Sequence, residues 1–145
     1  MLETSDDVLE VARKLMRAQA LRQREVEKEL EYVWRALENV SISFVETIEQ
    51  LQGLLETSAI REAEGSDTLR FALRHALERL DDGGIALDGK VGERFDPARH
   101  RAIEESQASE RGELLVMKVL SHGVTCAQRR FKPAEVVVHR ASEND

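Results

Sequence analysis

The sequence predicts an α+β protein, in which a long N-terminal coiled-coil helix and a four-helix-bundle dimerisation region precede a small C-terminal β-domain. Residues 1–82 contain two of the eight glycines and no proline, whereas residues 83–145 contain the other six glycines and both prolines. Glycine and proline mark turns, so a helical region should give way to a loop-rich one at this boundary. Apolar residues recur every three or four positions in the first region, and β-branched runs occur in the second. We therefore expect the β-domain over 83–141 and a tail over 142–145.

A long helix is predicted over about residues 6–57, because its apolar positions have the spacing of a coiled coil. These positions, called the seam below, are Val26, Leu30, Val33, Leu37, Val40, Phe44, Ile48, Leu51 and Leu55. Side chains spaced three and four residues apart fall on one face of a helix. From Val8 to Leu55 such a helix would be about 72 Å long, whereas a compact globule of this chain length has a radius of gyration of only about 15 Å. The seam therefore needs cover from another chain, and we predict that it forms the interface of a parallel homodimer.

A second helix is predicted over about 66–81, with Ser66 or Asp67 as its N-cap. Two helices per chain, doubled in a dimer, make a four-helix bundle. Strands are predicted at 114–120, 124–127 and 135–138, where β-branched and other apolar residues cluster.

Composition excludes several classes of function. Twenty-one basic and 28 acidic residues give a net charge of −7, which argues against a nucleic-acid partner. No apolar run approaches the ~18 residues that a membrane span requires, so no membrane partner is expected. The acidic N-terminus does not resemble a signal peptide, and a single cysteine, Cys126, cannot form an internal disulfide. These features favour a cytoplasmic protein.

No catalytic or metal-binding constellation is present in the sequence. It contains no phosphate-binding loop and no nucleophile paired with a base. His122 and Cys126 are four residues apart, but two ligands do not make a metal site. We therefore expect neither an enzyme nor a bound metal or cofactor.

Three local patterns suggest roles for individual residues. Asp96-Pro97 has the chemistry of an N-cap followed by proline at the first helical position, so a short helix through His100 and Ile103 is expected. The basic group Arg129, Arg130 and Lys132 is either a partner-binding patch or a solvated hairpin tip. Polar residues interrupt the apolar spacing of the long helix, and either control register or create a segment that frays on warming; these are Gln19, Arg22 and Gln23.

Two linked motifs in the second region resemble those of the GrpE family, the nucleotide-exchange factors of DnaK-class chaperones. A Phe-Asp-Pro-x-x-His-x-Ala motif is matched by Phe95, Asp96, Pro97, His100 and Ala102. A Gly-Tyr … Arg-x-x-Arg-Pro-Ala motif is matched by Gly123, Arg129, Lys132, Pro133 and Ala134. The chain departs from the second motif at Val124, which replaces the tyrosine, and at Lys132, which replaces the second arginine. The N-terminal arm is also short.

The resemblance implies a function without catalysis. In such a protein the β-domain binds the ATPase domain of the chaperone, opens its nucleotide cleft and accelerates ADP release. It also implies a partner-binding surface that contains Leu120, Gly123, Arg129, Arg130, Lys132 and Pro133. Phe95, Asp96, Pro97 and His100 would have a structural role. It further implies that the long helix is a candidate thermosensor. The alternative is a coiled-coil dimeric scaffold or regulator with the same fold, which binds a DnaK-class protein without promoting exchange.

Overall fold

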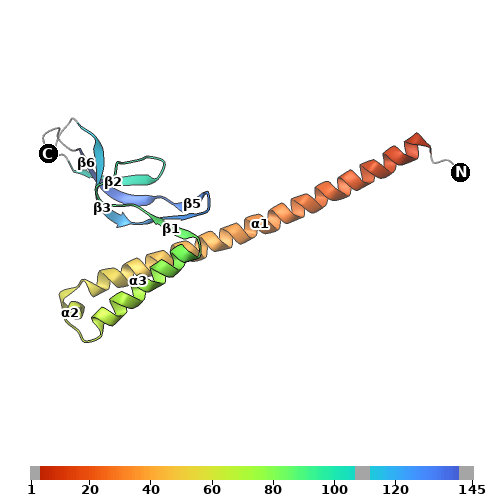
Figure 1. The fold of residues 1–145 in the computed structure, drawn as a ribbon. Helices are drawn as coiled ribbons and strands as arrows, with labels where there is room; N and C mark the ends of the chain where they lie inside the picture. The colour runs from red at the N-terminus through yellow and green to blue at the C-terminus, as the bar shows by residue number, and fades with distance from the viewer. Residues whose placement is uncertain (1–3, 107–111, 141–145) are drawn as a thin grey trace. The chain divides into compact units, whose positions relative to one another are not determined.

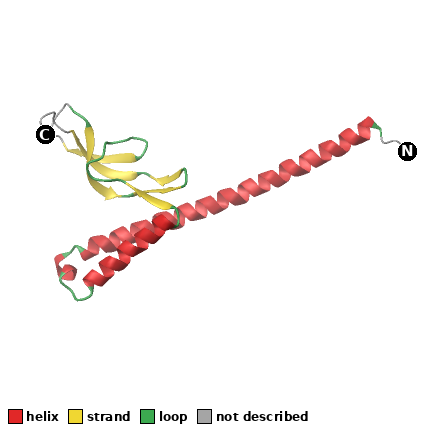
Figure 2. Cartoon of the chain, viewed as in Figure 1, coloured by secondary structure: helices red, strands yellow, loops and turns green. Residues whose placement is uncertain are grey.

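The computed structural model describes residues 4–106 and 112–140 and confirms the predicted α+β class (Figures 1 and 2). The helices are α1 (Ser5–Leu55), α2 (Ser58–Arg61) and α3 (Ser66–Asp82). The strands are β1 (Ile85–Asp88), β2 (His100–Ser106), β3 (Leu114–Ser121), β4 (Gly123–Cys126), β5 (Arg129–Lys132) and β6 (Ala134–Arg140). The chain forms two compact units, of which one ends at Asn39 and the other begins at Val40, within α1.

The first unit is helical from Ser5 onward. Thr4 and Asp7 begin α1 with a capping box: the backbone N–H of Asp7 donates to Thr4 Oγ1 at 3.4 Å, and the backbone N–H of Thr4 donates to Asp7 Oδ2 at 3.4 Å. Asp6 and Asp7 also place negative charge at the positive end of the helix dipole. The seam residues of this unit stay exposed in the single chain; Val26, for example, is 58% exposed.

The second unit begins with a pair of packed helices. The part of α1 after Val40 packs against α3 through a cluster of buried Ile48, Leu55 and Leu73. The short helix α2, which the apolar spacing did not predict, lies in the connection between α1 and α3. The expected N-cap of α3 at Ser66 or Asp67 is wrong by one position or more, because Gly65 occupies the N-cap with a φ of +86°. A glycine adopts this left-handed conformation without steric cost.

Among the described residues of the second unit, six strands form two three-stranded sheets. One sheet has the order β1-β4-β5, and all its pairs are antiparallel. The other has the order β2-β6-β3, in which β2 is parallel and β3 antiparallel to β6. The second sheet has a core of buried Val116, Ala134, Val136 and Val138, against which Phe95 packs. The predicted strands therefore correspond to β3, β4 and β6.

The short helix expected after Asp96-Pro97 is wrong. Asp96 starts a single turn, in which its Oδ1 accepts from the N–H of Ala98 and its carbonyl accepts from the N–H groups of Arg99 and His100. The turn ends at once because His100 is the first residue of β2 and pairs with Ala134 of β6. Sheet pairing, a long-range interaction, takes the backbone groups that a helix would have used.

Candidate partner-binding site

The six residues predicted to bind a partner come from neighbouring elements of the second unit. They lie at the end of β3, the start of β4, along β5, and between β5 and β6. Four of them are exposed, namely Leu120, Arg129, Arg130 and Pro133. The other two, Gly123 and Lys132, lie further inside the protein. Whether the exposed four contact a partner stays a prediction.

Gly123 has a packing role that follows from its lack of a side chain. A Cβ atom at this position would lie 2.8 Å from the backbone nitrogen of Ala134 and 3.0 Å from the carbonyl oxygen of Lys132. Contacts this short would force the backbone of the adjacent strands apart. The glycine of the second motif therefore allows β4 to approach the β5–β6 connection closely.

The ammonium group of Lys132 is directed into the second unit. The side chain is only 15% exposed, and Nζ lies 3.3 Å from Oε1 of Glu46 on α1. Nζ also donates a hydrogen bond to Oγ of Ser121. The lysine that replaces the second arginine of the motif thus joins β5 to α1, a role that its sequence position did not reveal.

Glu49 of α1 accepts three hydrogen bonds from Ser121, the last residue of β3, and His122, which precedes β4; these two residues are called the β3–β4 turn below. Its Oε1 accepts from the backbone N–H of His122 at 2.8 Å and lies 2.8 Å from the ring nitrogen Nδ1 of the same residue. Its Oε2 accepts from the hydroxyl of Ser121 at 3.2 Å. A carboxylate has no proton to give, so Nδ1 of His122 carries the proton in this contact.

These contacts decide the ionisation of Glu49. Burial raises the pKa of the Glu49 carboxyl, but hydrogen bonds from the ring and backbone of His122, attraction to that ring, and the Ser121 hydrogen bond together outweigh burial. The pKa of Glu49 therefore lies below its ordinary value. The carboxylate is held in its charged form.

We call the five residues that join α1 to the strands the helix–sheet cluster; they are Glu46, Glu49, Ser121, His122 and Lys132. Next to this polar cluster, Val45 of α1 is fully buried against Ile85 and Val124. A hollow of about 350 Å³ opens beside the cluster, and Leu120 and Glu135 also line it. The signal for this site in the sequence is weak: Glu49 stands one helical turn after Val45.

The first motif builds the loop between β1 and β2. His100 is buried at 3% exposure, and its Nδ1 accepts the backbone N–H of Asp96 at 2.9 Å. Nε2 must therefore carry the proton, and it donates to Oε1 of Glu93 at 2.7 Å. Burial raises the pKa of Glu93, but the Lys90 N–H, His100 and Arg99 outweigh it and lower the pKa. The histidine at the start of β2 thus holds two residues of the preceding loop, Glu93 and Asp96, in place.

The seam residues of the second unit divide into two groups. Ile48 and Leu55 are buried within the chain against Leu73 of α3. Val40, Phe44 and Leu51 keep at least a third of their surface exposed. The buried positions of α1 are Ser41, Val45, Ile48 and Leu55, a stripe next to the predicted seam rather than identical to it. Homodimerisation itself stays a prediction.

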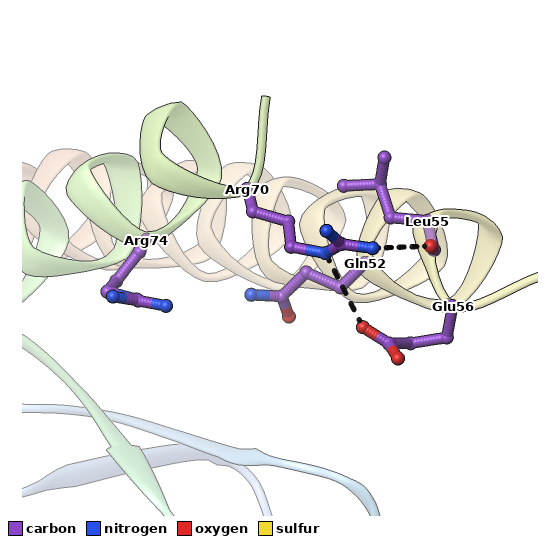
Figure 3. Close-up of a pocket in the computed structure, with 6 residues that line it drawn as sticks. Gln52, Leu55, Glu56, Arg70 and Arg74 are labelled. Atoms are coloured by element: carbon purple, nitrogen blue, oxygen red, sulfur yellow. Dashed lines mark hydrogen bonds and ion pairs between the residues drawn. The ribbon is translucent and has the colours of Figure 1, made fainter. Parts of the chain in front are cut away.

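A second hollow, of about 310 Å³, lies between the end of α1 and the start of α3 (Figure 3). Arg70 of α3 donates from Nη2 to the carbonyl oxygen of Leu55 at 2.9 Å, and its Nε lies 3.7 Å from Oε1 of Glu56. The last turn of α1 has no basic residue of its own. Arg70 therefore supplies positive charge to the negative end of the α1 dipole.

The described residues contain neither a metal-ligand cluster nor a helix that could cross a membrane. Across 4–106 and 112–140, no three His, Cys, Asp or Glu side chains are grouped so that they could hold a metal ion. Within the same ranges, no helix combines the length and the apolar character that crossing a membrane requires.

Comparison with known proteins identifies the family. A family model described as GrpE matches residues 3–140, nearly the whole chain. The chain belongs to the GrpE family. Protein GrpE of Leuconostoc citreum (strain KM20) is 28% identical over 143 residues, which are 94% of this chain and 75% of that protein. Protein GrpE of Polynucleobacter necessarius subsp. necessarius (strain STIR1) is 30% identical over 141 residues, with 94% and 77% coverage. Protein GrpE of Cupriavidus pinatubonensis (strain JMP 134 / LMG 1197) is 32% identical over 103 residues, with 71% and 55% coverage. Membership of the GrpE family supports a co-chaperone role beside a DnaK-class protein.

Proposed function

We propose that this GrpE-family chain is a nucleotide-exchange factor that binds the ATPase domain of a DnaK-class chaperone and accelerates ADP release. The observation that carries the proposal is the family match over residues 3–140, which includes both β-domain motifs in their expected order. In this proposal the chain breaks no bond, is not an enzyme, and acts in the cytoplasm.

Exchange without catalysis requires only differential binding. A factor that prefers the open, ADP-poor state of the ATPase domain shifts the chaperone toward that state. By thermodynamic linkage, the factor and ADP then weaken each other's binding by the same amount, typically about 1–3 kcal/mol. Weaker ADP binding appears as faster ADP release.

The surface proposed to contact the chaperone is centred on β5. Arg129 and Arg130 are exposed there, and exposed Leu120 and Pro133 flank them along the chain. Two guanidinium groups in a chain of net charge −7 are suited to meet an acidic surface on the ATPase domain and to steer its approach. Lys132 supports this surface from inside through its contact with Glu46.

We further propose that the chain acts as a parallel homodimer. Val26, Leu30 and Val33 are each more than half exposed in the single chain, as is Val40. An apolar stripe of this length on a helix is covered in water by a second helix. The α1–α3 pair of each chain would then contribute two helices to a four-helix bundle.

One observation favours the alternative of a scaffold that binds without promoting exchange. Because Lys132 is directed toward Glu46, the exposed basic patch contains two arginines rather than three basic residues. A smaller patch is expected to bind the ATPase domain less strongly, and the energy available to hold the open state falls with it.

Stopped-flow release of fluorescent ADP distinguishes the two proposals. Each DnaK-class ATPase domain of the same organism is loaded with the nucleotide and mixed with unlabelled ATP, with and without the chain. Faster release from at least one of them is the expected result. Binding in a pull-down with an unchanged release rate would support the scaffold. If the chain neither binds an ATPase domain nor accelerates ADP release, both proposals are rejected.

A further inference from the structure

We propose that Glu49 is a positioning residue: through the helix–sheet cluster it holds the strands of the β-domain at a fixed angle to the second half of α1. The consequence for nucleotide exchange rests on the function proposed above. The structural claim stands on the contacts within the second unit and has its own test.

The covalent connection between the helices and the strands leaves this angle undetermined. The chain passes from α3 to β1 through Gly83 and Gly84, and Gly84 has a φ of +92°. Two consecutive glycines have more conformational freedom than any other pair of residues. Something other than the backbone must therefore fix the direction in which the strands leave the helices.

Apolar packing brings the parts together without specifying their angle precisely. Val45 of α1 contacts Ile85 of β1 and Val124 of β4, and Leu80 of α3 packs against the same cluster. Leu87, Cys126 and Phe131 also pack against this cluster, but apolar attraction has no preferred direction. A patch of this kind tolerates a small rotation at little cost.

Glu49 supplies the missing directional contacts. Its two oxygens receive the backbone N–H and ring Nδ1 of His122 and the hydroxyl of Ser121, all from the β3–β4 turn. Hydrogen bonds to a charged carboxylate are short and depend strongly on angle. Three such bonds from two consecutive residues fix both the position and the orientation of the turn relative to α1. The Glu49 side chain is only 19% exposed, so water competes weakly for these bonds.

A second contact lies one strand away and shares a residue with the first. Lys132 of β5 reaches Glu46 on α1, and its Nζ donates to the Ser121 hydroxyl that in turn donates to Glu49. One hydrogen-bond network thereby links Glu46 and Glu49 of α1 to Lys132 of β5 and to the β3–β4 turn. Glu46 is half exposed, so its ion pair with Lys132 contributes less than the buried contacts of Glu49.

A fixed angle matters for an exchange factor because the β-domain must hold a lobe of its partner open. A β-domain that rotates freely on the Gly83-Gly84 connection would still present Arg129 and Arg130 to the partner. It would then follow the lobe as the cleft closes, and binding would no longer favour the open state. Loss of the Glu49 contacts should therefore lower the maximal exchange rate more than it lowers chaperone affinity.

The test uses three variants of the full chain. Glu49→Ala removes both acceptor oxygens. Glu49→Gln retains one carbonyl oxygen for the His122 donors, so it should keep part of the His122 protection and part of the maximal exchange rate. Glu29→Gln makes the same chemical change at an exposed position of α1 and serves as the control. Circular dichroism confirms that each variant keeps the helical content of the parent.

Two measurements are made on each variant. Amide hydrogen exchange, by NMR, reports protection of the His122 N–H; we expect about a tenfold loss in Glu49→Ala, a smaller loss in Glu49→Gln, and none in Glu29→Gln. A titration of ADP release against co-chaperone concentration separates the maximal rate from the half-saturating concentration. We expect the maximal rate of Glu49→Ala to fall about tenfold while half-saturation changes less than about threefold.

Each outcome has a defined meaning. Unchanged His122 protection in Glu49→Ala would overturn the structural claim. Lost protection with an unchanged maximal rate of ADP release would overturn the positioning role. A change in the half-saturating concentration alone would overturn it as well. If the parent chain itself accelerates no ADP release, the proposed function fails, and the protection measurement still decides whether Glu49 fixes the β3–β4 turn.

Discussion

The two halves of α1 have the same apolar spacing but different surroundings. In the first unit, before Val40, the seam side chains stay exposed; Val26 and Val33, for example, are each 58% exposed. In the second unit the helix buries Val45 against the strands and Ile48 against α3. The same three-and-four spacing can therefore serve contacts within a chain or contacts between chains, and the spacing alone does not distinguish them.

The largest expected effect separates these two kinds of position. Ile48→Ala should lower the free energy of unfolding by about 2–5 kcal/mol at any protein concentration, because its cavity lies inside one chain. Leu30→Ala should cost stability only where a second chain covers the seam, so its effect should shrink on dilution. Urea unfolding of both variants at two concentrations, a hundredfold apart, measures the difference. An equal, concentration-independent loss for Leu30→Ala would mean that the first unit is stabilised within its own chain.

A second comparison contrasts the outward and inward basic residues of β5. Arg129→Ala should weaken chaperone binding by roughly 1–2 kcal/mol, or about tenfold in Kd, with little effect on unfolding. Lys132→Met should instead lower the free energy of unfolding and leave chaperone binding little changed, because the Nζ contacts with Glu46 and Ser121 lie inside the second unit. Its expected cost is about 1 kcal/mol of stability. Calorimetric titration and urea unfolding give the two numbers, and equal weakening of binding by both variants would contradict the distinction.

A smaller effect should appear on acidification of the second unit. The pKa of Glu49 in the folded protein lies below its ordinary value of 4.5, so the folded state favours the charged carboxylate. This contribution to stability is present above pH 4.5 and is lost as the pH falls through the folded pKa. The unfolding free energy of Glu49→Gln should therefore decrease less between pH 5 and pH 3 than that of the parent. Glu29→Gln, the control, should follow the parent; an identical pH profile for Glu49→Gln would count against the charged contact.

The smallest effect concerns heating. We expect the first unit to lose helix before the second, because polar Gln19, Arg22 and Gln23 interrupt its apolar spacing. Circular dichroism at 222 nm should then show a shallow loss of ellipticity before the cooperative transition. Substituting Gln19 and Gln23 by leucine should remove the early phase. A single transition in the parent chain would exclude a thermosensor of this kind.

Elements governed by local chemistry were predictable from the sequence, and those governed by distant partners were not. The long helix and the strand around Val136 follow from spacing and β-branching, which act over a few residues. The helix expected after Asp96 failed because β6, more than thirty residues away, pairs with the same backbone. Family resemblance found Lys132, but nothing in its neighbourhood in the sequence showed that its partner is Glu46.

The same division applies to the candidate partner-binding site: its exposed arginines were predictable from the sequence, and its contacts with α1 were not. Arg129 and Arg130 stand out as the one dense basic group in an acidic chain, and the structure leaves both exposed. Glu49 and His122 are separated by 73 residues, and each resembles an ordinary surface residue. A contact between two such residues is specified by the topology that brings the β3–β4 turn to α1, which no local pattern encodes.

The hydrogen bond from Arg70 to the carbonyl of Leu55 has a consequence for folding. The last turn of α1 obtains its cap from a residue fifteen positions later, which reaches that carbonyl only once α3 has formed and docked. The end of α1 therefore lacks this contact while α3 is unfolded, and Leu73 of α3 lacks its apolar partners Ile48 and Leu55 while α1 is unfolded. The end of α1 and the beginning of α3 should therefore form and melt as one cooperative unit, although they belong to two separate helices.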